Sequence, residues 1–264
     1  MKKDIGRIDW RFKLLYAVAI IMVCCGHTNG GGLNLFADWF PYVGMHLALF
    51  VFSAGYFYKD SDEEKMGEWL LKKLKKLIIP LYLYNVAYAV IVVLLKKIGF
   101  DIGGDFTLYN LLIAPITDGH QFIYNLGGWF IIPFFLVETV NILFRKLLGR
   151  LGRVPEPVYF ALSVAVGLLG NQLACMGYRE GLWLILVRTL YFLPFYGLGI
   201  FYRRGLEKWE RKIPNFWCFA ILFSVKLLLT YGYGKVLGYT PSWCNDFTEG
   251  PLMPIVVGYL GIAM

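Results

Sequence analysis

The sequence predicts an all-α protein, a polytopic bundle of about seven to eight transmembrane helices. Hydrophobic residues make up 58% of the 264 residues and charged residues only 17%. A soluble domain of this length needs more polar side chains to cover its surface. The mean hydropathy of +0.57 agrees with this, and the apolar residues gather in runs that approach the length of a membrane span. These observations favour a membrane protein over a large soluble core.

Seven apolar segments follow one another along the chain. We predict spans at residues 14–26, 40–58, 77–95, 128–144, 158–176, 182–202 and 216–233. The first is short and reaches span length if Lys13 extends to the interface and residues 27–29 complete the other end. An eighth segment begins at Pro251 and reaches residue 264. Either the chain is truncated inside this span or the segment packs on another element. We expect one membrane domain over residues 1–264.

The basic residues predict the orientation of the spans. Lys and Arg concentrate before the first span, between the second and third, after the fourth and after the sixth, while the other connections are poor in them. This alternation is typical of cytoplasmic loops and places the N-terminus in the cytoplasm. The net charge of +8 therefore indicates membrane topology and not nucleic-acid binding. The five cysteines form no C-x-x-C pair, so we expect no metal site.

A basic amphipathic segment at residues 63–76 precedes the third span. Its apolar residues recur at helical spacing, and Lys72, Lys73, Lys75 and Lys76 share the remaining arc. Such a helix is typical of an interface with anionic lipid. Attraction of an anionic cofactor such as the nucleotide of CoA is the alternative interpretation.

Polar side chains interrupt the predicted spans. His27 ends the first span and His46 lies in the second, so the topology puts both histidines on the same side of the bilayer. Ionisable residues at membrane depth are costly and mark pathways or ion pairs, and for Glu138 pairing with Arg188 or Lys226 is the structural alternative. On a helix, Tyr16 shares the face of His27 and Lys13 lies within about 40° of it. This stripe suggests a path through the bundle.

Five stretches, in order along the chain, resemble the acyltransferase-3 family of integral membrane acyltransferases, in particular its sugar or fucose O-acetylase-like branch. They are AIIMVCCGHTN, GMHLALFVFSAGYFY, LLKKLKKLIIPLYLYN, GGWFIIPFFLVE and RTLYFLPFYGLGIFYRR. Two departures stand out: Tyr16 occupies a position where the family usually has Arg or Lys, and Ala54 is inserted in a Ser-Gly-Tyr motif. The family also has about ten spans, each of about 20 residues.

The resemblance implies transfer of an acyl group, often acetyl, from cytoplasmic acyl-CoA to a hydroxyl of a cell-surface or extracytoplasmic carbohydrate, in the plasma membrane of a bacterium. Acyl-CoA would be a co-substrate, with no permanently bound cofactor. A neutral histidine suits general-base or nucleophilic chemistry, so we assign His27 as base and His46 as its assistant. Arg188 and Lys13 would hold the donor or, for Arg188, the oxyanion.

Acceptor-binding candidates are Trp129, His120 and Asn85. Trp129 could pack on a sugar ring or belong to the aromatic belt at the interface. We expect His120 to be solvated in an outer loop. Glu138 and Lys226 remain polar residues within the membrane without an assigned role. The competing hypotheses are a transporter or flippase of a polar or glycan substrate, and a truncated, non-catalytic family member. We see no internal repeat, which argues against a transporter.

Overall fold

The described part of the structure is built from helices. The computed structural model describes residues 9–27, 44–100, 103–122, 127–150, 152–210, 212, 215–229, 239–247 and 249–264. Within these residues there is no β-strand, only an isolated bridge between Thr240 and Asn245. The prediction of an all-α membrane helix bundle is confirmed.

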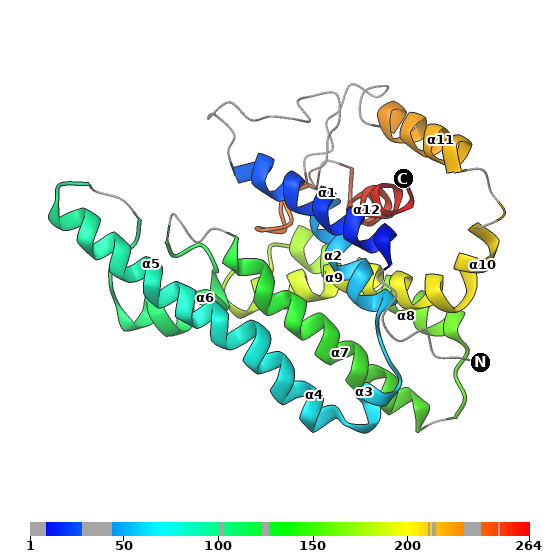
Figure 1. Cartoon of the computed structure of the whole chain (residues 1–264), viewed down its shortest axis with the longest axis horizontal. Coiled ribbons are helices and arrows are strands. Elements are labelled where there is room, and N and C mark those ends of the chain that lie inside the picture. Colours follow the sequence, from blue (N-terminus) through cyan, green and yellow to red (C-terminus); the bar gives the residue numbers. More distant parts are fainter. Residues whose placement is uncertain are drawn as a thin grey trace.

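Four helical stretches among the described residues are long and apolar enough to cross a membrane. They are Trp10–His27, Met66–Lys97, Glu156–Cys175 and Leu182–Glu210. The first is α1 and the third is α8, whereas the others combine several labelled elements (Figure 1). Helices α2 (His46–Tyr56), α11 (Asn215–Leu227) and α12 (Met253–Ala263) are apolar but shorter. Parts of the predicted spans at 40–58 and 216–233 fall outside the described residues.

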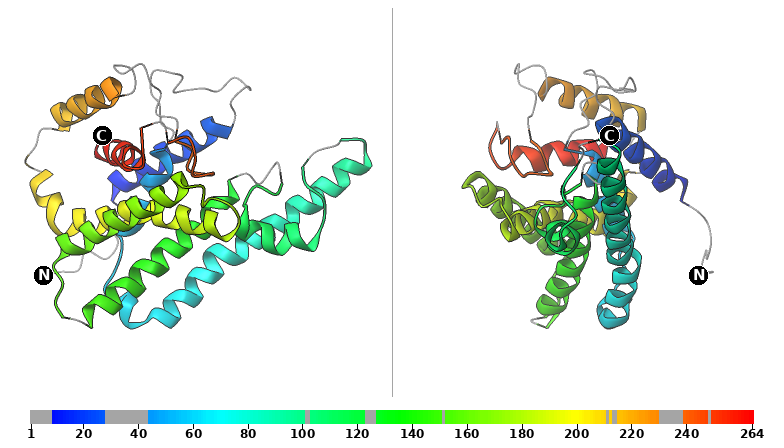
Figure 2. Two further views of the ribbon diagram at one scale, coloured as in Figure 1. Left: turned by 180° about the vertical axis from the view of Figure 1, so that it is seen from behind. Right: turned by 90° about the vertical axis from the view of Figure 1, so that its left-hand side faces the viewer.

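Helix α9 (Leu182–Phe201) is the centre of the bundle, and most of its residues are buried. It packs against α8 on one side and α2 on another (Figure 2). At the α2 crossing a Cβ on Gly55 would meet the backbone of Tyr196, and one on Gly199 would meet the backbone of Phe52. Small residues let membrane helices approach to backbone contact, so these two glycines set the position of α2.

The segment from Met66 to Lys97 is one continuous helix, whereas we expected a separate interfacial helix at residues 63–76. It comprises α4 (Met66–Lys73), the π-helical turn η1 (Leu74–Ile78) and α5 (Ile79–Lys97). The widened turn ends two residues before Pro80, whose ring and missing N–H disturb α-helical bonding in the preceding turn. Because the helix does not break here, its basic turn runs beside α7 (Ile131–Gly149).

Ion pairs join several helix ends near α3 (Ser61–Glu64). Glu156, at the start of α8, accepts from Arg145 on α7 and from Arg204 in the π-helical turn η5 (Tyr202–Leu206). Arg204 also pairs with Asp60, just beyond α2. The Arg145 side chain is buried and lies over the rings of Tyr58 and Tyr159. This network fixes the start of α3, α7, α8 and η5 relative to one another.

Candidate active site

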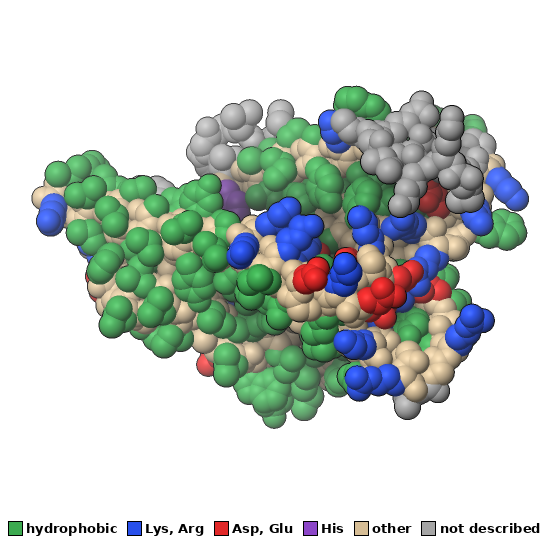
Figure 3. Space-filling model, turned by 60° about the horizontal axis from the view of Figure 1, so that its bottom comes forward, with side chains coloured by type: hydrophobic (Ala, Val, Ile, Leu, Met, Phe, Trp, Pro, Cys, Tyr) green, Lys and Arg blue, Asp and Glu red, His purple; other side chains and the backbone are tan. Residues whose placement is uncertain are grey.

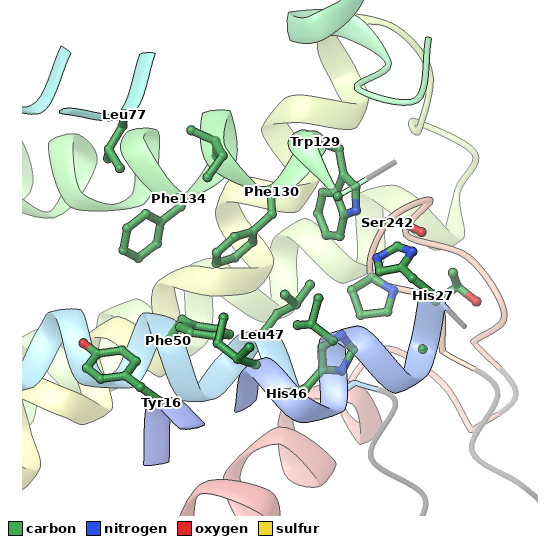
Figure 4. A pocket seen from close by; sticks show the side chains of 17 residues that line it. Tyr16, His27, His46, Leu47, Phe50, Leu77, Trp129, Phe130, Phe134 and Ser242 are labelled. Carbon is green, nitrogen blue, oxygen red and sulfur yellow. The ribbon is translucent and has the colours of Figure 1, made fainter. Parts of the chain in front are cut away.

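His27 and His46 line one cavity. Helix α1 ends at His27 and α2 begins at His46, and both of these helix ends lie at the same end of the bundle. The cavity has a volume of about 610 Å³. Trp129, from the short helix η4 (Gly128–Phe130), and Phe134, from α7, lie across from the histidines (Figure 4). We call this space the histidine cavity.

A second space, which we call the lysine cavity, adjoins it. It has a volume of about 410 Å³ and lies between the end of α2, α4, η1 and α7. Its charged lining residues are Lys59, Lys72, Lys73, Lys76, Asp62 and Glu138. Figure 3 shows the surrounding face, on which Lys and Arg side chains gather with a few carboxylates among them. Four lysines against two carboxylates give this lining a net charge of +2.

The two cavities share three lining residues, Tyr16, Leu77 and Phe134. Tyr16 projects from α1 beside Phe50 of α2, with 5.8 Å between ring centroids. Lys13 lines neither cavity: its side chain is exposed, and its Nζ lies 4.7 Å from the ring centroid of Trp10. The angle between Lys13 and His27 around the axis of α1 is therefore large enough that the Lys13 side chain faces neither cavity.

Glu138 pairs with Lys73, and not with Arg188 or Lys226 as the sequence suggested. Lys73 reaches Glu138 because α4 and η1 run beside α7, whereas α11, which carries Lys226, lies elsewhere in the bundle. Helix α9 also packs on α7, but its Arg188 donates to the backbone carbonyls of Ser242 and Asp118. Lys226 is buried on α11, with its Nζ 2.7 Å from Sδ of Met45. One carboxylate oxygen of Glu138, Oε2, is buried and has no hydrogen-bond partner among the described residues.

Arg188 is almost completely buried, with 1% of its surface exposed, and lies behind the wall of the histidine cavity. Its Nε donates to the carbonyl of Ser242 at 2.7 Å and its Nη1 to that of Asp118 at 3.0 Å. The guanidinium also lies 4.8 Å from the ring centroid of Trp129. These contacts direct its donors to the backbone, so the geometry favours positioning of the cavity wall over direct binding of a phosphate.

His120 is packed in an aromatic stack, whereas we expected it to be solvated. Its ring lies 4.7 Å from that of Trp243 and 6.1 Å from that of Trp129, both nearly parallel. Burial lowers the pKa of His120 below its ordinary value, and the nearby charge of Arg188 adds to the effect. His120 thus supports Trp129 from behind and does not line the histidine cavity.

Asn85 holds α5 to the neighbouring π-helical turn η2 (Tyr109–Ile113). Its Nδ2 donates to the carbonyls of Asn110 and Leu111 at 3.1 and 2.9 Å, and its Oδ1 accepts from Gln121. It is fully buried and lines neither cavity. An amide that satisfies a backbone in this way has a structural role, which the sequence alone did not distinguish from acceptor binding.

Sequence reasoning missed the segment at residues 240–242, which completes the histidine cavity. This stretch, TPS, lies between the predicted span at 216–233 and the apolar segment that begins at Pro251. It carries no titratable group. Its only signal was its polarity between apolar runs. Within the described residues, no group of three or more His, Cys, Asp or Glu side chains could hold a metal ion.

The chain was compared with protein families, curated proteins and solved structures. The family model described as an acyltransferase domain, that of the acyltransferase-3 family, matches residues 10–264. No curated protein and no solved structure matches the chain. The match includes every residue that lines the two cavities. The chain therefore belongs to the acyltransferase-3 family of membrane acyltransferases.

Proposed function

We propose that this protein transfers an acyl group, acetyl in the simplest case, from acyl-CoA to a hydroxyl group of an extracytoplasmic carbohydrate. The observation that carries the proposal is the pair of adjoining cavities, one basic and one lined by two histidines, which share Tyr16, Leu77 and Phe134. Membership of an acyltransferase family favours this reaction over transport of a solute along the same path.

The lysine cavity supplies the features that the donor requires. The phosphates of CoA are anionic, and lysines are common phosphate ligands, so the net positive lining attracts them. The basic end of the bundle faces the cytoplasm by the distribution of Lys and Arg. Tyr16 and His27 are eleven residues apart on α1, about 16 Å along the helix axis. The thioester arm would pass Tyr16 and carry the acyl group into the histidine cavity.

The chemistry in the histidine cavity follows from a neutral imidazole. His27 accepts the proton of the acceptor hydroxyl while the hydroxyl oxygen attacks the thioester carbonyl carbon. The carbon–sulfur bond then breaks, the ester forms, and the CoA thiolate takes the proton from His27. His46, on the adjoining helix end, orients the acceptor or His27. Trp129 and Phe130 give the cavity aromatic walls that suit the face of a sugar ring.

The test is acyl transfer by the full chain in lipid nanodiscs, with labelled acetyl-CoA and cell-envelope glycans as acceptors. We expect His27→Ala to lower the transfer rate by about 10²- to 10⁴-fold, the usual contribution of a general base. Ile21→Ala is the control, because it changes an exposed residue of the same helix that lines neither cavity. Transfer that His27→Ala leaves unchanged would remove His27 from the chemistry.

A further inference from the structure

A third hollow lies on the far side of the segment that closes the histidine cavity. It has a volume of about 360 Å³, within the range of about 300–1,000 Å³ typical of small-molecule sites. We call it the Trp243 pocket. Its walls come from η2, the residues after α6 (Ala114–Thr117), the start of α9 and the segment around Trp243. Its lining residues are Tyr109, Thr117, Asp118, Arg179, Glu180, Gly181, Leu184, Trp243 and Asn245.

One short segment separates this pocket from the histidine cavity. Thr240 and Ser242 line the histidine cavity, whereas Trp243 and Asn245 line the Trp243 pocket. The bridge between Thr240 and Asn245 closes the segment into a tight turn. Arg188 bonds the carbonyls of both Ser242 and Asp118, so one buried guanidinium fixes a wall of each space. The two spaces therefore have a fixed mutual position.

Polar side chains line one wall of the pocket. Asp118 and Asn245 both belong to its lining, and the Asp118 side chain is 43% exposed. Its Oδ1 is buried and lies 3.8 Å from Nδ1 of His120, so the exposed part of the side chain is the remainder of the carboxylate and its Cβ. An ionised carboxylate only accepts hydrogen bonds, so it favours a ligand that carries donors, such as the hydroxyl groups of a sugar.

The remaining lining points to a neutral sugar. The ring of Trp243 stacks on His120 and is 42% exposed, and Tyr109 is 54% exposed. Exposed aromatic rings combine an apolar face with a polar edge, which matches the two kinds of surface on a pyranose ring. The charged lining residues are Asp118, Glu180 and Arg179, a net of −1 that disfavours a phosphate or another polyanion.

We propose that the Trp243 pocket is a second sugar subsite, which binds the unit of the acceptor glycan adjacent to the one that is acylated. This rests on the proposed function, since it takes the histidine cavity as the place of acyl transfer. The acceptor is then a disaccharide or a longer glycan with at least one neutral unit, and not a free monosaccharide. Trp243 stacks on the second ring, and the exposed part of the Asp118 carboxylate accepts hydrogen bonds from its hydroxyl groups.

The experiment measures saccharide binding and acyl transfer in parallel, with the full chain in nanodiscs. The probes are neutral mono-, di- and trisaccharides of glucose, galactose, rhamnose and N-acetylglucosamine, and binding is followed by saturation-transfer NMR. The variants are Trp243→Ala and the nearly isosteric Asp118→Asn. The control is Trp217→Ala, which removes an exposed tryptophan of α11 that lines none of the three spaces.

We expect at least one di- or trisaccharide to bind more tightly than its monosaccharide. Both variants should weaken that binding by about tenfold, the effect of removing a central contact of a binding site. Neither should change monosaccharide binding or the KM for acetyl-CoA, and the control should bind as the wild type does. Equal loss for mono- and disaccharides, no loss in either variant, or no binding of any probe would each overturn the subsite.

The two readouts separate the subsite from the proposed function. Wild-type protein that binds a disaccharide through Trp243 but transfers acetyl to no acceptor would contradict the transferase and leave a sugar-binding pocket. Transfer to a disaccharide that does not depend on Trp243 or Asp118 would support the transferase and overturn the subsite.

Discussion

The ion pair between Lys73 and Glu138 predicts an asymmetric response to substitution. The side chain of Glu138 is 5% exposed, and that of Lys73 is 28% exposed at the wall of the lysine cavity. Lys73→Met would leave a buried carboxylate whose Oε2 already lacks a hydrogen-bond donor among the described residues. Glu138→Gln would leave an ammonium group that can turn into the cavity and become hydrated.

The burial of each partner determines how much stability each substitution should cost. Removing one partner of a buried pair costs about 3–5 kcal/mol when the remaining charge stays buried, and this applies to Lys73→Met. Glu138→Gln should cost about 1 kcal/mol, because the exposed ammonium recovers most of its hydration. The double variant leaves no uncompensated charge, so we expect it to regain on the order of 2 kcal/mol over Lys73→Met.

The assay is thermal unfolding of each variant in one detergent, together with the KM for acetyl-CoA. Glu138→Gln raises the net charge of the lysine cavity from +2 to +3, so its KM should fall, by up to about fivefold for a partly exposed charge. Lys76→Met, at a lysine that lines the same cavity, should raise the KM with little change in stability. Equal destabilisation by Lys73→Met and Glu138→Gln, or a double variant no more stable than Lys73→Met, would refute the reasoning.

Three further predictions concern packing, pH and specificity. Gly55→Val should abolish the yield of folded protein in size-exclusion chromatography, because its side chain would meet the backbone of α9. Gly67→Ala is the contrasting change: its side chain would lie in open space on α4, so it should stabilise the helix by up to about 1 kcal/mol. Because the pKa of His120 is lowered in the folded state, the unfolded state binds more protons below about pH 6.5. Thermal stability should then fall from pH 7 to pH 5, and less steeply in His120→Gln. Tyr16→Ala should widen the junction of the two cavities and raise kcat/KM for propionyl- and butyryl-CoA relative to acetyl-CoA. The increase should be about fourfold per methylene group if that group is fully buried. An unchanged ratio of kcat/KM values would contradict the role of Tyr16.

The positions of several helices could be predicted because apolar runs are local information. The expected span at 182–202 is α9 (Leu182–Phe201), and the one at 158–176 is α8 (Glu156–Cys175). The continuity of the chain from Met66 to Lys97 could not be predicted in the same way. The four lysines after Leu71 are typical of a helix that lies at the membrane interface. Only the structure shows that the helix continues past these lysines and packs against α7.

The candidate site could also be predicted only in part from the sequence. That His27 and His46 share a cavity follows from topology, since a helix that ends at one histidine is followed by a helix that starts at the other. The partner of Glu138 depends on which basic side chain reaches it in the packed bundle, and the sequence offered Arg188 and Lys226 as alternatives. Arg188 lies on α9, which packs on α7, but its donors are used by backbone carbonyls, and Lys73 forms the pair. Burial of Arg188 behind Trp129 likewise depends on the segment around Ser242, which carries no motif.

The departure at Tyr16 has a physical explanation in the arrangement of the cavities. The resemblance predicts a basic residue at position 16, which lies eleven residues before His27 on the same face of α1. Here the positive charge next to the junction comes from the facing helix, since Lys72, Lys73 and Lys76 line the cavity that Tyr16 adjoins. A second charge on α1 is then unnecessary for attracting an anionic donor, and an uncharged ring can occupy the junction. Under the proposed function, a tyrosine at this junction narrows the passage of the acyl group from the lysine cavity to the histidine cavity, and we expect it to favour a short acyl group over a long one.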